Sequence, residues 1–195
     1  MLLPLAMKLA RIAAFLCLLP LAACSGDKPW HATNITGGMP RLEFHMTRAD
    51  SGTAATAEDF RGKIAILYFG YTHCPDVCPT TLADLTDVLM RLGKQADQVR
   101  VLFVTVDPAH DTPAVLKSYG EAFAPQVVGL SGSANDLARL ARTYRVAYSV
   151  TTTPTYEVMH SNAVFFFDRD GRARLVTTST TDTAGLAEDI KRLIE

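Results

Sequence analysis

The chain has 195 residues, of which 48% are apolar, and a formal net charge of −1 at pH 7. This length and apolar fraction suit one globular domain built around a single core. Neither a basic patch nor a run of like charges stands out, so the composition argues against a nucleic-acid partner.

Residues 1–23 have the pattern of a secretory signal peptide. Two basic residues, Lys8 and Arg11, precede a short apolar stretch that ends in small residues before Cys24. This stretch is shorter than the about 20 residues that cross a bilayer. The order Leu-Ala-Ala-Cys at 21–24 resembles the bacterial lipobox, which implies cleavage before Cys24 and a lipid on its sulfur. The alternatives are a plain signal peptide or an uncut anchor, with Cys24 incidental.

Cleavage of this leader changes the charge and the cysteine count. The leader carries two of the 19 basic residues and none of the 20 acidic ones, so the mature chain has a net charge of −3. Cys17 leaves with the leader and Cys24 is acylated, so Cys74 and Cys78 are the expected free thiols. An exported compartment tolerates disulfides, but a disulfide framework needs more cysteines than two.

The rest of the chain is predicted to form a tether over 24–39 and one domain over 40–195. Apolar runs and alternation predict strands, and apolar residues at helical spacing together with capping residues predict helices. The predicted strands are 41–46, 63–70, 99–106, 127–130, 163–167 and 174–177. The predicted helices begin at Pro79, Pro113, Ser133 and Thr183, and the first of them ends at Gly93.

Strands that alternate with helices indicate an α/β fold with a mostly parallel central sheet. A turn at 168–171 closes a hairpin and adds an antiparallel edge. The predicted architecture is therefore thioredoxin-like, a mixed sheet flanked by helices with an inserted helix and a C-terminal hairpin. The cysteines follow the central strand at its carboxyl end, where open α/β sheets place their sites.

The loop Cys74-Pro75-Asp76-Val77-Cys78-Pro79 is constrained by its two prolines. A helix that began at Pro75 would place Pro79 in its interior, so a helix start at Pro79 is expected. Pro75 and Asp76 then suit the middle of a tight turn that brings Cys74 back to Cys78. The helix dipole favours a thiolate on Cys78, and thiolates both bind metals and attack disulfides.

The pair supports three kinds of chemistry. A passive disulfide between Cys74 and Cys78 would close a very short loop and contribute only about 2 kcal/mol. Structural zinc usually needs four protein ligands, and the chain offers no second cysteine pair. Two soft thiolates with one imidazole suit Cu(I).

Five histidines could supply that imidazole. His31 and His45 are expected to be structural or solvated, and His110 to lie in a surface loop. His73 adjoins the first cysteine and is expected to point away from it while tuning the thiolates. His160 lies just before a predicted strand, at a position that faces the cysteine loop in thioredoxin-like folds. By position alone, a lone histidine of this kind is more often structural.

Three blocks of sequence carry a family resemblance. They are Tyr-Phe-Gly-Tyr-Thr-His-Cys-Pro-Asp-Val-Cys-Pro at 68–79, Val-Thr-Val-Asp-Pro at 104–108 with Asp-Thr-Pro at 111–113, and His160-Ser161 before an apolar strand. With these blocks, the chain resembles the Sco/SenC family of copper-binding thioredoxin-like proteins over roughly residues 40–195.

The resemblance implies that Cys74, Cys78 and His160 bind one copper ion, as Cu(I) or Cu(II). It implies a role in delivering copper to, or reducing thiols of, the binuclear copper centre of cytochrome c oxidase, and we expect a metallochaperone rather than an enzyme. The expected partners are the copper-site subunit of that oxidase and other periplasmic copper carriers. With a lipid on Cys24, the protein would face the periplasm of a bacterial envelope, at the inner membrane or, as the alternative, at the outer one.

One departure and two rival functions stay open. Many relatives carry Asp before the distal histidine, where this chain has Met159, which either packs or serves as a soft ligand. The first rival is a thiol–disulfide oxidoreductase with Cys74 and Cys78 as its catalytic thiols, although Cys-x-x-Cys is the usual spacing for that chemistry. The second rival is a copper or redox sensor, with residues 142–159 as a mobile loop near the site.

Overall fold

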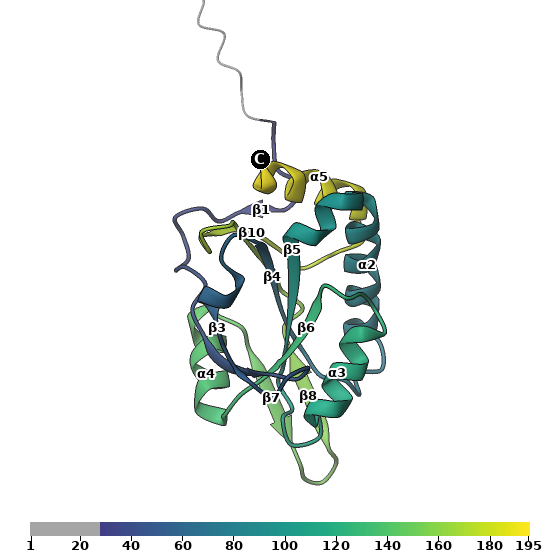
Figure 1. The fold of residues 1–195 in the computed structure, drawn as a ribbon. Coiled ribbons are helices and arrows are strands. Elements are labelled where there is room, and N and C mark those ends of the chain that lie inside the picture. The colour runs from purple at the N-terminus through teal and green to yellow at the C-terminus, as the bar shows by residue number, and fades with distance from the viewer. Residues whose placement is uncertain (1–27) are drawn as a thin grey trace, which may run out of the picture.

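The alternation of strands and helices is present in the computed structural model, which describes residues 28–195 (Figure 1). The strands are β1 (Thr33–Asn34), β2 (His45–Arg48), β3 (Ala54–Thr56), β4 (Ile64–Gly70), β5 (Val99–Thr105), β6 (Val127–Ser131), β7 (Tyr148–Thr151), β8 (Glu157–His160), β9 (Val164–Phe167) and β10 (Ala173–Thr177). The helices are α2 (Val77–Leu92), α3 (Pro113–Glu121), α4 (Ala134–Thr143) and α5 (Thr183–Ile194), with 3-10 turns η1 (Ala57–Phe60) and η2 (Gly93–Gln98). The predicted leader at 1–23 and the lipidation site at Cys24 lie outside the described residues.

The main sheet is mixed, as predicted. Its strand order is β1-β10-β9-β4-β5-β6-β2-β3, and a separate two-stranded sheet joins β7 to β8. The central strands β4, β5 and β6 are parallel, whereas β9 and β10 pair antiparallel to form the closing hairpin. The thioredoxin-like α/β prediction, including the inserted helix and the C-terminal hairpin, is confirmed.

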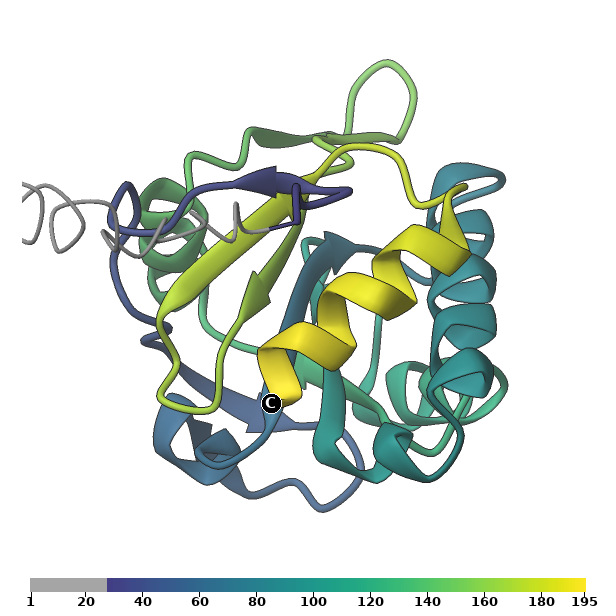
Figure 2. The same cartoon turned by 90° about the horizontal axis from the view of Figure 1, so that it is seen from above.

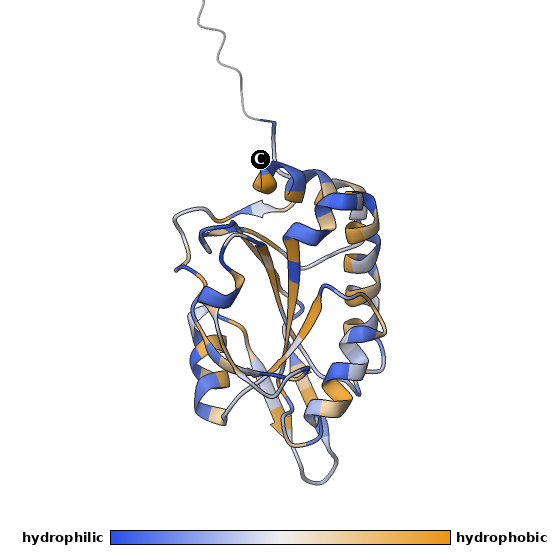
Figure 3. Cartoon of the chain, in the orientation of Figure 1, coloured by the Kyte–Doolittle hydropathy of each residue, from blue (hydrophilic) through white to orange (hydrophobic). Residues whose placement is uncertain are grey.

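Strand β4 shows why the centre of the sheet is apolar throughout. Its side chains alternate between two cores, one against α2, α3 and α5 and the other against α4. Ile64, Ile66 and Tyr68 face the first core, and Ala65, Leu67 and Phe69 face the second. A strand buried on both faces has no polar alternation. Figure 1 shows α2 and α3 opposite α4, Figure 2 shows α5 beside α2, and Figure 3 shows the apolar central strands.

Several elements differ from the prediction. The strand predicted over 41–46 begins later, as β2, and the last helix is capped by Asp182, whose side chain accepts the N–H of Gly185, rather than by Thr183. The segment 142–159, predicted as a mobile loop, contains the paired strands β7 and β8. Its threonines and tyrosines make the segment look like a polar loop, but both residue types are also favoured in β-strands.

The first described residues pack on α5, which differs from the tether predicted over 24–39. The carboxylate of Asp189 is buried and accepts the backbone N–H groups of His31 and Ala32 at 2.8–3.1 Å. Strand β1 then extends the sheet by pairing with β10. Buried backbone groups need partners, and a buried carboxylate on α5 supplies one.

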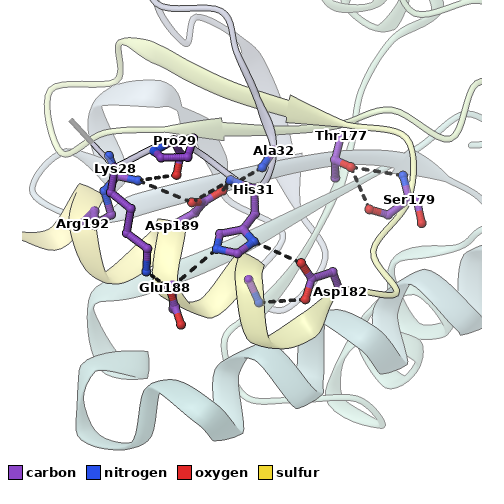
Figure 4. A network of polar contacts seen from close by, with 11 residues as sticks. Lys28, Pro29, His31, Ala32, Thr177, Ser179, Asp182, Glu188, Asp189 and Arg192 are labelled. Atoms are coloured by element: carbon purple, nitrogen blue, oxygen red, sulfur yellow. Dashed lines mark hydrogen bonds and ion pairs between the residues drawn. The ribbon is translucent and has the colours of Figure 1, made fainter. Parts of the chain in front are cut away.

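His31 is structural, as predicted, and holds this same contact together. Its Nδ1 lies 3.2 Å from Oδ2 of Asp182, and its Nε2 lies 3.6 Å from Oε2 of Glu188, as Figure 4 shows. The guanidinium of Arg192 stacks over the Trp30 ring at 3.6 Å. Both contacts fasten the N-terminal segment to α5.

Different parts of the chain form the two ends of the molecule. The first described residues and the C-terminus lie at one end, and the β7–β8 hairpin lies at the other (Figure 1).

Over residues 28–195, no helix has the combination of length and apolarity that a membrane crossing requires.

Candidate metal centre

The cysteine loop begins where β4 ends at Gly70. A turn over Thr72 and His73 brings the N–H of Cys74 to 3.3 Å from the carbonyl of Tyr71, and the chain then bends at 75–76. The hydrogen-bonded turn thus precedes Cys74, whereas we predicted it at Pro75 and Asp76. The bend still brings the loop back, because the N–H of Cys78 points at the sulfur of Cys74 at 3.4 Å.

Helix α2 begins at Val77, two residues before the predicted start at Pro79. Pro79 therefore stands in the first turn, where backbone N–H groups have no intrahelical partner, so the missing N–H of a proline does no harm. The first helical hydrogen bond runs from the N–H of Thr80 to the carbonyl of Asp76 at 3.3 Å. Cys78 is consequently the second residue of α2, and its side chain is buried.

Gly70 makes room for the second thiol. A Cβ atom at this position would lie 2.9 Å from Sγ of Cys78 and 2.6 Å from Cε2 of Phe103. Both distances are shorter than ordinary contacts, so the absence of a side chain lets the sulfur pack against the end of β4. This gives a physical reason for glycine at the end of an otherwise bulky strand.

His160 reaches the thiols from the last position of β8. Its Nε2 lies 3.2 Å from Sγ of Cys78, and its Nδ1 lies 3.0 Å from the carbonyl oxygen of Ser161. A carbonyl only accepts, so Nδ1 carries the proton and Nε2 presents a lone pair toward the sulfur. This is the tautomer in which an imidazole binds a metal through Nε2.

The structure brings all three predicted ligands together. One donor atom each from Cys74, Cys78 and His160 lies within 4.8 Å of the others, and both thiols are unpaired. Within residues 28–195, no further cluster of three or more His, Cys, Asp or Glu donors is found. A set of two sulfurs and one nitrogen is short of the four ligands of structural zinc and suits a soft ion such as Cu(I).

The other histidines lie apart from the cluster. His31 is bound to α5, and His45 is exposed on β2. His110 contacts Asp107, with Nδ1 3.0 Å from the carboxylate. His73 is mostly exposed, and its ring lies 3.1 Å from the hydroxyl of Thr72. The contacts agree with the interpretation of His31, His45 and His110, whereas the tuning of the thiolates by His73 stays a prediction.

The two thiols differ in acidity, and the favoured thiolate predicted at Cys78 is not found. Burial raises the pKa of Cys78 to about 12, so the helix start does not stabilise its thiolate. Burial also opposes the Cys74 thiolate, but the N–H groups of Asp76 and Cys78 outweigh it and lower the pKa of Cys74. The prediction failed because Cys78 is fully buried, whereas Cys74 receives those N–H groups at the rim of the site.

This asymmetry predicts an order of alkylation. With a pKa of about 12, only about 0.01% of Cys78 is thiolate at pH 8, because each pKa unit changes the ratio tenfold. Cys74 has the lower pKa and is partly exposed, so iodoacetamide should modify it first, at a rate that rises with pH until its own pKa is passed. Site-resolved mass spectrometry of the metal-free chain, sampled over time, measures both rates.

Unfolding the chain in urea supplies the control for this experiment, because both thiols should then react at similar rates. A Cys74→Ser chain should lack the fast reaction, and a Cys78→Ser chain should keep it. Equal rates for the two thiols in the native protein would contradict the assignment of Cys74 as the more acidic sulfur.

Aromatic side chains form the walls of the site. The rings of Tyr68 and Tyr71 meet the His160 ring edge to face, with centroids 6.1 and 5.9 Å away. Val77 and Met159 line the open cleft beside them. Met159 is 60% exposed, so it does not pack into the core. With Val77, it makes the rim of the cleft apolar.

Asp111 holds the cysteine loop in place, and sequence reasoning missed this role. Its buried carboxylate accepts the N–H of Thr72 at 3.1–3.2 Å and the hydroxyls of Thr72 and Thr105 at 2.5 Å each. We read Asp111 only as part of a helix start. A signal did exist, since polar residues that follow neighbouring parallel strands meet at one edge of a sheet.

Comparison with known proteins agrees with this geometry. A family model described as SCO1/SenC matches residues 40–195. The mitochondrial protein SCO2 homolog of Bos taurus is 42% identical over 125 residues, which are 62% of this chain and 47% of that protein. This chain thus spans about half the length of the curated relatives it matches.

Two solved structures are similar in fold and sequence. ScoI of Bradyrhizobium japonicum with copper bound superposes with a TM-score of 0.71 and 38% identity, covering 78% of this chain and 98% of that one. Yeast Sco1 with copper bound gives a TM-score of 0.69 and 32% identity, covering 78% and 88% of the two chains.

Proposed function

This chain belongs to the SCO1/SenC family, and we propose on that premise that it is a copper metallochaperone of cytochrome c oxidase assembly. Cys74, Cys78 and His160 would hold one copper ion, which is the cargo of the protein. The recipient would be the binuclear copper site of the oxidase. Relatives solved with copper bound support the choice of metal.

The observation that carries this proposal is the convergence of two sulfurs and an imidazole nitrogen within 4.8 Å. The two thiols come from one loop, and the histidine comes from a hairpin 82 residues further along the chain. Such a donor set favours a soft monovalent ion, and three donors leave room for an incoming ligand. Transfer would then proceed by ligand exchange with the cysteines of the recipient.

The position of the thiols fits exchange with a partner. Cys74 is partly exposed at an open cleft, whereas Cys78 is fully buried. An incoming thiolate can therefore reach the ion from the side of Cys74, while Cys78 and His160 keep their places. The apolar rim at Val77 and Met159, both exposed, would lie against the partner.

Copper titration of purified protein tests the proposal. The reduced wild-type chain should bind one Cu(I) per molecule, measured by metal analysis and by competition with a Cu(I) chelator. The loss of a residue that only supports a metal ligand lowers metal affinity by about 10-fold or more. His160→Ala removes a direct ligand, so it should weaken Cu(I) binding by at least this factor. His45→Ala is the matched control, since His45 is exposed on β2 and should leave the affinity unchanged. A wild-type chain that binds no copper would overturn the proposal.

A second candidate function rests on the same asymmetry of the thiols. Cys74, with its lowered pKa and partial exposure, has the properties of an attacking thiol, and the buried Cys78 has those of a resolving one. The protein could in this way reduce the copper-site cysteines of the oxidase before copper arrives. This function requires that a Cys78→Ser chain retain its target through a disulfide at Cys74.

We also propose that the domain is held at the bacterial cell envelope and faces the periplasm. The support is the leader pattern over 1–23 and the lipobox-like order that ends in Cys24. The inner membrane is the site where an assembly factor of the oxidase would work, and the outer membrane is the alternative.

A further inference from the structure

The hairpin that carries His160 is separate from the main sheet. Strands β7 and β8 pair only with one another among the described strands. The base of the hairpin is fixed, because the N–H of Ser161 donates to the carbonyl of Ala147 at 2.9 Å and the side chains of Tyr148 and Val158 pack on the core. The far end, residues 152–157, needs an anchor of its own.

That anchor is a hydrogen bond from Tyr156 to Asp107. The hydroxyl of Tyr156 donates to Oδ2 of Asp107, a carboxylate that is almost completely buried. Among residues 28–195, this is the one side-chain hydrogen bond that ties residues 152–157 to the rest of the domain, beside the pairing of Glu157 with Thr151 within the hairpin itself. A hydrogen bond to a charged acceptor is stronger than one between neutral groups.

His110 completes the anchor from the other side. Its Nδ1 lies 3.0 Å from Oδ1 of Asp107, so the two carboxylate oxygens have separate partners. The His110 ring also packs against the Tyr156 ring, with centroids 4.5 Å apart. Burial and the bond to Asp107 raise the pKa of Tyr156, which keeps the phenol protonated and able to donate.

The anchor lies one residue before the strand that carries the ligand. In β8, Val158 and His160 are half-buried, whereas Glu157 and Met159 are exposed, as the alternation of a strand requires. Tyr156 precedes β8 and is 43% exposed, but its hydroxyl reaches the buried carboxylate of Asp107. Four extended residues span about 13 Å. Tyr156 thus fixes the strand at a distance from the metal centre.

The segment 107–111 also holds the other half of the site. Asp111 accepts the N–H and hydroxyl of Thr72 in the cysteine loop. The backbone N–H of Asp111 donates to the carbonyl of Asp107 at 2.9 Å, so the two carboxylates are held in one rigid turn. One carboxylate of this turn fastens the thiol loop, and the other fastens the histidine hairpin.

We propose that Asp107 and Tyr156 are positioning residues that fix His160 relative to the two thiols, by fastening its hairpin to the turn that holds the cysteine loop. Neither residue contacts the metal. The inference rests on the proposed function for its copper readout, but the anchor itself is a property of the metal-free protein.

Hydrogen exchange of the metal-free full chain in detergent tests the anchor. Tyr156→Phe should speed amide exchange over residues 148–160 by about 10-fold or more, the effect of losing a hydrogen bond to a charged acceptor. Tyr148→Phe is the matched control on the same hairpin, because its hydroxyl forms no hydrogen bond to another described residue. Asp107→Asn keeps an acceptor oxygen and should give a smaller change. Exchange that is the same in Tyr156→Phe and in wild type would overturn the anchor.

A double-mutant cycle on Cu(I) affinity tests whether the anchor acts through His160. Tyr156→Phe alone should weaken binding by about 10-fold, as outer-shell changes do, and should leave one copper per chain. In a His160→Ala background, the same change should have no further effect. Additive losses, or an unchanged affinity in the single variant, would overturn the positioning role. Absence of copper binding by the wild type would instead reject the proposed function, and the exchange result would still decide the anchor.

Discussion

Replacing Cys78 by serine should lower the Cu(I) affinity of the chain by more than about 100-fold, beyond the loss that outer-shell changes cause. The sulfur is fully buried, 3.2 Å from Nε2 of His160, so the substitution removes one of the three converging donors. Serine supplies a hard oxygen, which is a poor ligand for a soft ion. The fold should survive, because the new hydroxyl can donate to Nε2. Chelator competition and circular dichroism measure the two quantities.

The matched control is Ser161→Ala. The buried hydroxyl of Ser161 forms no hydrogen bond to another described residue, and the substitution keeps the carbonyl that orients His160. Its affinity should equal that of wild type. The Cys78→Ser chain also tests the second function, since Cys74 should then retain a target as a mixed disulfide. If this chain kept the wild-type affinity, the two-thiolate site would be wrong.

Replacing Asp111 by alanine should have the largest effect on stability, with a loss of about 3–4 kcal/mol in the free energy of unfolding. The carboxylate is buried and accepts hydrogen bonds from Thr72 and Thr105. Alanine would leave the buried hydroxyl of Thr105 and the half-buried donors of Thr72 without this acceptor, and hydrogen bonds to charged groups are among the stronger ones. Urea denaturation of the metal-free chain measures the change.

Two further variants separate this effect from the loss of a charge. Asp111→Asn keeps one acceptor oxygen and the shape of the side chain, so its loss should be smaller than that of alanine. Asp170→Ala removes an exposed carboxylate that pairs with Arg172 at 2.7 Å, and such surface pairs contribute about 1 kcal/mol or less. A loss in Asp111→Ala no larger than that in Asp170→Ala would contradict the buried network.

Much of the fold could be predicted because its central elements have strong local patterns. The run 64–70 is apolar on both faces, as a strand between two helical layers must be. Pro113 stands at the first turn of α3 behind the capping residue Thr112, and Gly93 ends α2 with a positive φ of 56°. Each of these signals depends only on residues that are close together in sequence, so it can be recognised without knowledge of the tertiary structure.

The elements that were missed depend on partners far away in the chain. Strand β1 has two residues, and it forms because β10 offers partners to its backbone and the carboxylate of Asp189 holds the N–H groups of His31 and Ala32 just before it. The β7–β8 hairpin is exposed on one side and is rich in threonine, so no apolar period distinguishes it from a loop. Its far end is fixed by Asp107, which lies 49 residues away in sequence.

The sequence by itself determined the donors of the site. It contains two thiols in a proline-restricted loop after a buried strand, and its motifs single out His160 among five histidines. The tertiary structure alone decided the distances and the acidities. It buried Cys78, which raised the pKa of the thiol whose thiolate the helix start was expected to favour, and left Cys74 at the rim with a lowered pKa. The physical reason is that a donor's identity belongs to one residue, whereas its burial and its hydrogen bonds are set by segments that packing brings together.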